Sequence, residues 1–329
     1  MERWVSSLLW IGKVGVASLL AIVILSLFSY GYSYSGVHIA SETGVTDYKW
    51  EANQRKAAMT EGFAWIRMDR NGYNNTYTEV DKVNVLLMGS SHMEAVNVAS
   101  DKNTGYLLNK LLPGYTYNIG ISGHTIYNCI NNLQNAVTEY SPNWIVIETD
   151  RVKLECDKMK DVVDGNFPHI KSYDSGVLYY IQKYVPGVKL IYNQLSNWIN
   201  MENDDNESIM REDISENYVE ILDEFLSTAA STMTNSQKLL IVYQPKTAID
   251  ESGKYLSTSE DRYSEIFRQR CKSIGIEFVD LSEEFEALYT TEHVLAHGFS
   301  NTAAGEGHLN ETGHKIFAEQ VEAVVRRQK

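Results

Sequence analysis

Short apolar runs alternate with amphipathic stretches over residues 81–329. Five of these runs are almost continuously apolar: Val83–Met88, Tyr115–Ile119, Trp144–Glu148, Leu239–Tyr243 and Glu277–Asp280. Such runs are expected for strands that are covered by helices on both faces of a sheet. Between them, apolar residues recur at helical spacing from Ile214 to Ala229 and, less regularly, from Ile266 to Ile274. The pattern predicts an α/β fold, a three-layer α/β/α sandwich around a mostly parallel five-stranded sheet.

The remaining segments define how the chain is organised. A last helix is predicted after Asn310, which is suited to capping it. Residues 155–213 form an insertion rich in Asp, Asn and Tyr between the third and fourth strands, and residues 31–80 are polar without a long apolar run. We therefore expect a stalk with some N-terminal elements over 31–80 and one main domain over 81–329.

The segment from Leu8 to Phe28 is apolar over a length that crosses a bilayer core. Its only charge is Lys13, near the start, and no Lys or Arg follows until Lys49. This asymmetry predicts a single-pass membrane anchor within residues 1–30, with a cytoplasmic N-terminus and the rest of the chain outside. A cleaved signal peptide and a buried core helix are the alternatives; the first would require a small-residue cleavage site, and Ser-Tyr-Gly-Tyr-Ser-Tyr follows instead.

Composition and charge narrow the function classes. The formal net charge is −14, charged residues make up 22% of the chain, and Lys and Arg form no block apart from a short C-terminal Val-Val-Arg-Arg-Gln-Lys. A diffusely acidic chain is a poor candidate for binding nucleic acid. The three cysteines are not at zinc-ligand spacing, and the glycines form neither a phosphate-binding loop nor a dinucleotide fingerprint, so we expect no metal and no cofactor.

Three segments bring reactive residue types to places where a parallel sheet binds ligands. The first strand ends in Gly89-Ser90-Ser91, and ligands bind at the carboxyl ends of such strands. The second strand leads into residues 118–125, Asn-Ile-Gly-Ile-Ser-Gly-His-Thr, whose glycines allow close approach of the backbone to a substrate. The third segment places His308 on a glycine-flanked loop before the last helix, where it is exposed enough to act as a base.

Together these segments resemble the SGNH/GDSL hydrolase superfamily over roughly residues 82–327. Gly89-Ser90-Ser91 is similar to the Gly-Asp-Ser nucleophile block, residues 118–125 to the second block, and residues 307–310, Gly-His-Leu-Asn, to the last block. The resemblance implies a flavodoxin-like hydrolase fold with Ser91 as nucleophile and His308 as general base. It also implies that the N–H groups of Ser91 and Gly123 hold the oxyanion.

The chain departs from the family pattern in its acid and in one oxyanion donor. Three residues before His308 the family has an Asp, but here stands Gly305. Glu306 is one position off and is our candidate for the third triad member; otherwise His308 acts in a dyad, or its carboxylate comes from elsewhere. The Asn that the family places after the third strand is missing, and Asp150 and Arg151 occupy this region.

Further side chains near the blocks are expected to contact the substrate. These candidates are His92, His124, Asp150, Arg151 and His297.

The function expected from the resemblance is that of an extracytoplasmic serine esterase or O-acyltransferase. Its partner would be an acylated glycan or wall polymer, most simply one with O-acetyl groups, and export or modification proteins would act beside it. Two alternatives remain open: a partner in D-alanine esterification of teichoic acids, and a degenerate SGNH domain that binds glycan as a scaffold. Retention of both Ser91 and His308 favours an enzyme, because a binding protein has no need of that pair.

Overall fold

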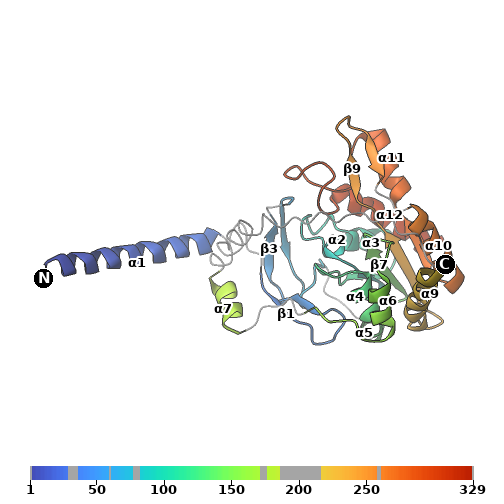
Figure 1. The fold of residues 1–329 in the computed structure, drawn as a ribbon, viewed down its shortest axis with the longest axis horizontal. Helices are drawn as coiled ribbons and strands as arrows, with labels where there is room; N and C mark the ends of the chain where they lie inside the picture. The colour runs from blue at the N-terminus through green and yellow to red at the C-terminus, as the bar shows by residue number, and fades with distance from the viewer. Residues whose placement is uncertain are drawn as a thin grey trace.

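A five-stranded parallel sheet forms the centre of the protein, in the order β11-β8-β7-β5-β6 (Figure 1). The structure is a computed structural model that describes residues 2–28, 36–58, 61–76, 82–170, 176–185, 216–257 and 261–327. The strands are β5 (Val83–Met88), β6 (Tyr115–Asn118), β7 (Trp144–Thr149), β8 (Lys238–Tyr243) and β11 (Glu277–Asp280). They coincide with the five apolar runs of the sequence, so the predicted fold class is confirmed.

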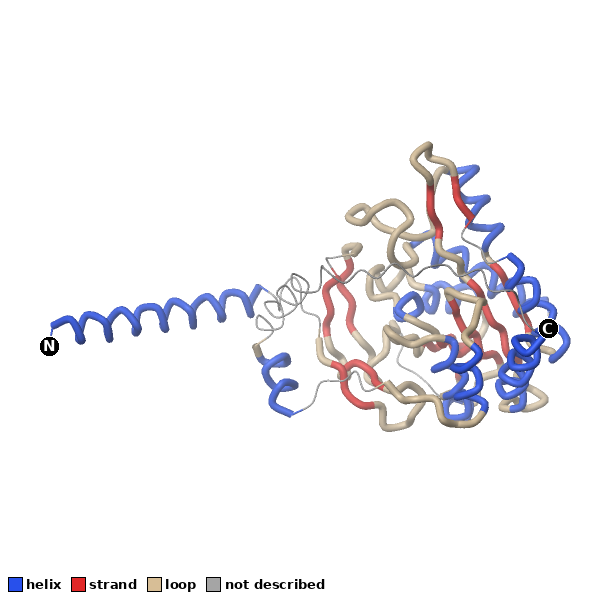
Figure 2. The backbone as a smooth tube through the Cα atoms, in the orientation of Figure 1, coloured by secondary structure: helices blue, strands red, loops and turns tan. Residues whose placement is uncertain are grey.

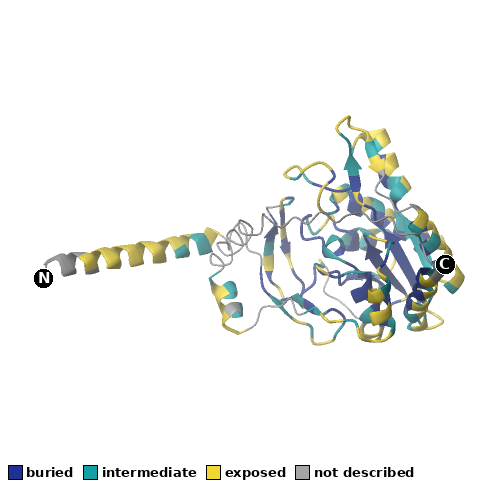
Figure 3. Ribbon diagram, viewed as in Figure 1, coloured by how far each residue is buried: buried dark blue, intermediate teal, exposed yellow. Residues whose placement is uncertain are grey.

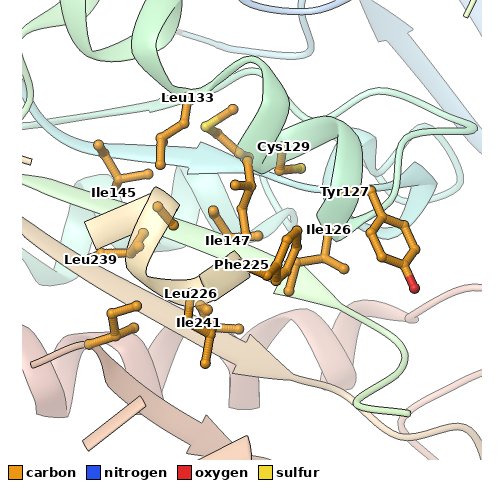
Figure 4. Close-up of a cluster of buried hydrophobic side chains, with 14 of the residues drawn as sticks. Ile126, Tyr127, Cys129, Leu133, Ile145, Ile147, Phe225, Leu226, Leu239 and Ile241 are labelled. Atoms are coloured by element: carbon orange, nitrogen blue, oxygen red, sulfur yellow. The ribbon is translucent and has the colours of Figure 1, made fainter. Parts of the chain in front are cut away.

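Helices cover both faces of this sheet, since successive strand residues point to opposite sides. In β5, Leu86 packs into one core cluster and its neighbour Leu87 into the other. The first cluster, shown in Figure 4, includes side chains of α4, α5 and α9, among them Phe225. Helices that contribute to it are α4 (Ile126–Asn131), α5 (Leu133–Tyr140), α6 (Cys156–Val163), α9 (Glu216–Ser231) and α10 (Asp261–Ile274). Those on the opposite face are α3 (Thr104–Leu111), α11 (Ser282–Glu292) and α12 (Glu311–Arg327).

Two antiparallel pairs of short strands precede the sheet and pack beside it. They are β1 (His38–Ala40) with β2 (Tyr48–Trp50), and β3 (Arg55–Ala58) with β4 (Ala64–Arg67). Their inward side chains form a third core cluster with Val96 and Ile121, which follow β5 and β6 in the chain. The residues after β4 also contact the central sheet, because the hydroxyl of Tyr117 in β6 donates to the Asp69 carboxylate at 2.8 Å. The described part of residues 31–80 is thus integrated with the main domain.

Three further elements lie at the periphery. The helix α1 (Glu2–Phe28) extends away from the domain, and its segment Leu9–Phe28 is long and apolar enough to cross a membrane, with a mean hydropathy of 2.3 (Figures 2 and 3). A signal sequence would meet the same criterion. Of the insertion predicted over 155–213, the structure describes α6 and the short helix α7 (Gly176–Tyr184), while 171–175 and 186–213 lie outside the described residues. A small hairpin, β9 (Thr247–Ile249) with β10 (Tyr255–Ser257), follows β8.

Candidate active site

Ser91 lies just after the carboxyl end of β5, as the sequence predicts. The chain turns at Gly89 and Ser90, and Ser91 begins the single-turn helix α2 (Ser91–Glu94), with the Ser90 hydroxyl accepting from the N–H of His92 at 3.2 Å. A side chain at position 89 is excluded because a Cβ there would lie 2.6 Å from Oε2 of Glu148. The tight turn therefore presents the Ser91 side chain at the edge of the sheet where parallel strands bind ligands.

His308 contacts Ser91 directly, although the two residues are far apart in the sequence. Its Nε2 lies 2.8 Å from Oγ of Ser91. The histidine loop is held in place by α12, whose N-cap Asn310 accepts hydrogen bonds through Oδ1 from the N–H groups of Thr312 and Gly313, at 3.0 and 3.1 Å. The cap predicted at Asn310 therefore also fixes the loop that places His308.

The carboxylate beside His308 comes from Glu61. Its Oε2 lies 2.6 Å from Nδ1 of His308, and its Oε1 accepts a hydrogen bond from the backbone N–H of His308. A carboxylate can only accept, so this contact places the proton of the neutral imidazole on Nδ1 and leaves the lone pair of Nε2 facing Ser91. That is the arrangement required of a general base.

Glu306, the residue we expected in this position, is exposed, and the hydrogen-bond partners of the His308 ring are Glu61 and Ser91 instead. It lies between Gly305 and Gly307, both of which have positive φ, and its backbone N–H bonds to the Ala303 carbonyl. Gly307 leaves the room that Glu61 occupies, because a Cβ there would lie 2.1 Å from Oε1 of Glu61. The expectation for Glu306 is thus corrected: the carboxylate that contacts Nδ1 of His308 is that of Glu61, in the β3–β4 hairpin, which is distant in sequence.

The β3–β4 hairpin positions Glu61 through the loops that it touches. The N–H of Gly62 donates to Oδ1 of Asn301 at 2.9 Å. A Cβ on Gly62 would lie 2.4 Å from the carbonyl oxygen of Asn97, so the hairpin approaches the loop after α2 closely. The side-chain nitrogen of Asn97 also lies 2.9 Å from Nδ1 of His308; because both nitrogens are donors when Nδ1 donates to Glu61, this is a packing contact and not a hydrogen bond. No spacing in the sequence links Glu61 to His308, which explains why sequence reasoning missed it.

The two expected oxyanion donors both have free N–H groups within the part of the chain that the structure describes. The amides of Ser91 and Gly123 donate to no protein acceptor there. Gly123 is exposed and has φ +84, which favours glycine at this position. The amide of Gly120, by contrast, is occupied by Oδ1 of Asn118 at 2.9 Å. The oxyanion role of Ser91 and Gly123 remains a prediction.

A buried polar network supports the turn that carries Ser91. Oε2 of Glu148 accepts from the N–H and the hydroxyl of Ser90, at 2.8 and 2.9 Å, and its Oε1 accepts from Nε2 of Gln244 at 3.0 Å. Oε1 of Gln244 lies 2.6 Å from Nε2 of His297. Burial disfavours the charged carboxylate and raises the pKa of Glu148 to about 7. No motif or spacing in the sequence indicates this network.

The histidines expected to contact substrate have other partners. His297 is buried between Gln244 and Thr247, and burial lowers its pKa to about 3. His124 is buried with its Nε2 3.6 Å from Oδ2 of Asp47, and desolvation lowers its pKa to about 4. Neither side chain is available to a substrate in this arrangement, so both expectations are corrected.

His92, Asp150 and Arg151 lie nearer the site. Nδ1 of His92 accepts from the N–H of Leu309 at 3.1 Å, and the His92 ring lies 5.0 Å from that of His308. His92 therefore supports the loop that carries the candidate base, and burial lowers its own pKa to about 3. Asp150 and Arg151 follow β7, partly exposed, with Nε of Arg151 3.3 Å from Oδ1 of Asp150. Their substrate contact remains a prediction.

The arrangement is suited to nucleophilic chemistry. A hydroxyl, an imidazole and a carboxylate form a continuous hydrogen-bonded chain, which activates a weak nucleophile by placing a base within reach of its proton. Within the described residues, no three His, Cys, Asp or Glu side chains are grouped so as to hold a metal ion.

No protein-family model matches this chain, and no curated protein matches it in sequence. Among solved structures, it is similar to a two-domain esterase (CEX) active on acetylated mannans, at 10% identity and a TM-score of 0.41, over 75% of this chain and 49% of the other. This chain thus spans about half of that esterase. It is also similar to the acetyl xylan esterase AlAXEase (15% identity, TM-score 0.42, over 74% and 100%). A third similar structure is a lipase/acylhydrolase from Enterococcus faecalis, at 13% identity and a TM-score of 0.40, over 75% of this chain and 96% of the other. The chemistry available to this site depends on its own side chains, those of Ser91, His308 and Glu61.

Proposed function

We propose that this protein is a serine esterase or O-acyltransferase that forms an acyl-enzyme on Ser91. The observation that carries the proposal is the hydrogen-bonded chain from Glu61 through His308 to Ser91, at 2.6 and 2.8 Å. In this proposal α1 anchors the chain in the cell membrane, with the N-terminus in the cytoplasm and the catalytic domain outside.

The geometry supports the following reaction. Oγ of Ser91 attacks the ester carbonyl while Nε2 of His308 takes its proton, and Glu61 holds the resulting imidazolium by accepting from Nδ1. The N–H groups of Ser91 and Gly123 stabilise the tetrahedral oxyanion. His308 then returns the proton to the leaving alcohol, and an acyl-Ser91 ester remains. Water completes a hydrolysis; a sugar hydroxyl completes a transfer.

The proposed substrate is an O-acetylated polysaccharide or other polymer of the cell envelope. An ester next to a neutral sugar suits a protein with a net charge of −14 better than a polyanion does, since like charges slow their approach. The acetyl group and the polymer are inferred by analogy with the family that the sequence resembles.

A partner role in D-alanine esterification of teichoic acids would use the same Ser91 acyl-enzyme with a different acyl group. A glycan-binding scaffold is disfavoured by Glu61, because a binding protein gains nothing from a carboxylate that orients a histidine toward a serine. The chain therefore has a complete candidate triad although the acid of the family's last block is missing.

The test is labelling of the full chain in detergent with a serine-reactive fluorophosphonate probe. Wild type should be labelled, and labelling should be lost in Ser91→Ala and His308→Ala. Ser273→Ala serves as the control for serine reactivity, because Ser273 is an exposed serine near the end of α10 and takes no part in the network around Ser91 that is described above. A folded wild type that resists the probe would refute the acyl-enzyme and favour the scaffold. Wild type that has not been treated with the probe is then assayed on acetylated xylan and on D-alanyl esters to distinguish the acyl groups.

A further inference from the structure

The helix α7 presents an apolar face to solvent. Val177, Tyr180, Ile181 and Tyr184 recur at helical spacing, so they share one side of the helix. Val177, Tyr180 and Tyr184 are 76%, 60% and 68% exposed, respectively, and the rings of Tyr180 and Tyr184 stack at 6.4 Å. A contiguous exposed patch of this kind marks an interaction site.

The other side of α7 is fixed to the start of the domain. Glu51, directly after β2, accepts from the Tyr179 hydroxyl at 2.8 Å and from Nζ of Lys183 at 2.5 Å. The backbone N–H of Glu51 donates to the carbonyl of Val37 at 3.2 Å. Val37 follows Phe28, the last residue of α1, by nine positions. Nine residues span at most about 30 Å, so α7 is held close to where α1 ends.

A second exposed surface lies on β4 and the residue before it. Side chains alternate between the core and solvent from Phe63 to Arg67: Phe63, Trp65 and Arg67 are exposed, while Ala64 and Ile66 are buried. Phe63 is 66% and Trp65 is 56% exposed. Arg67 pairs in register with Arg55 of β3, which is also exposed. Figure 1 shows β3 and α7 at the end of the domain that faces α1.

The composition of these two surfaces matches one partner. Tyr and Trp are the residues enriched at membrane–water interfaces, where a ring meets lipid and its polar edge meets water. Arginines near a bilayer surface attract anionic lipid head groups by Coulomb interaction. In a chain with a net charge of −14, a face that combines aromatic rings with Arg55 and Arg67 is distinct from the acidic remainder.

We propose that the exposed faces of α7 and β4 lie on the surface of the bilayer from which α1 emerges. This docking rests on the proposed anchor and goes beyond the proposed function, because it fixes how the catalytic domain is oriented. Glu61 lies two residues before Phe63, so the docked hairpin is also the one that supplies the triad carboxylate. The site would then lie close to the membrane rather than at the end of a free stalk.

The experiment uses the full chain in vesicles of phosphatidylcholine and phosphatidylglycerol, with Cys156→Ser to remove the partly exposed thiol. An environment-sensitive fluorophore is attached through Tyr180→Cys or Phe63→Cys and quenched by nitroxide-labelled lipids. The matched control is Leu256→Cys, an exposed apolar position on β10. We expect quenching at positions 180 and 63 to be several-fold stronger than at 256.

The outcomes separate the anchor from the docking. Flotation of the chain with the vesicles, together with equal quenching at all three positions, overturns the docking and leaves the anchor intact. Failure to float refutes the anchor, and the docking with it. Strong quenching at position 63 but not at 180 overturns the role of α7. Fluorophosphonate labelling of the same samples reports on Ser91 independently of either result.

Discussion

Replacing Glu61 with glutamine tests whether this residue is the triad acid. Glu61→Gln keeps the shape of the side chain but removes the charge that faces Nδ1 of His308. Two effects follow. The imidazolium that forms in the transition state loses its counter-charge, and the amide can present N–H in place of an acceptor, which favours the tautomer with its proton on Nε2 and blocks proton transfer from Ser91.

The geometry sets the expected magnitude. Unit charges about 4 Å apart interact by on the order of 4 kcal/mol at an effective dielectric constant of about 20. The side chains of His308 and Glu61 are 31% and 20% exposed, so solvent screening reduces this to roughly 2 kcal/mol, or about 30-fold in rate. Loss of the correct tautomer adds to this, toward the roughly 10⁴-fold effect of the equivalent change in Ser–His–Asp triads. We expect a loss in kcat/KM between these limits.

The assay is hydrolysis of p-nitrophenyl acetate, with the rate of fluorophosphonate labelling as a second measure of Ser91 reactivity. Glu306→Gln is the matched control, because Glu306 is exposed and only two residues from His308. It should retain wild-type kinetics within about twofold. Equal thermal melting of both variants excludes unfolding as the cause. A severe loss in Glu306→Gln, with Glu61→Gln unaffected, would refute the assignment of the acid.

Three further predictions concern the surroundings of the site. Gly307→Ala should lower kcat/KM at least about tenfold, because its Cβ would lie 2.1 Å from Oε1 of Glu61. The control is Gly165→Ala, which is also at positive φ but has open space around it and should affect only stability. Steady-state kinetics distinguish the two variants. The folded-state pKa of Glu148 is raised to about 7, so its contribution to stability is highest below the unfolded pKa of about 4.5 and falls by about 3 kcal/mol as pH rises through 7. Urea unfolding of wild type and Glu148→Gln across this range should show that slope only in wild type. Phe225 lies on the buried face of α9, so Phe225→Ala should lower the free energy of unfolding, measured by urea titration, by about 3–5 kcal/mol. A loss below about 1 kcal/mol would contradict its burial.

Local sequence pattern was sufficient for the frame of this protein. Each of the five apolar runs is a strand of the central sheet. A strand that is covered on both faces is almost continuously apolar, so it can be recognised from the local sequence alone. Ser91 and His308 could be predicted for a similar reason. Each lies where a recognisable strand or helix begins or ends, and the sheet topology brings these ends to one edge. Their contact at 2.8 Å follows from that placement.

Only the tertiary structure determines which carboxylate lies beside His308 and which residues surround the candidate triad. Glu61 and His308 are separated by 247 positions, and their contact depends on how the β3–β4 hairpin packs on Val96 and Ile121. Nearness in sequence favoured Glu306, but the two glycines around it direct that side chain to solvent. The burial of His297 could not be predicted from the sequence either, because its partners, Gln244 directly after β8 and Thr247 in β9, are distant in the chain. Contacts of this kind depend on the packing of whole elements, which periodicity and spacing along one segment do not encode.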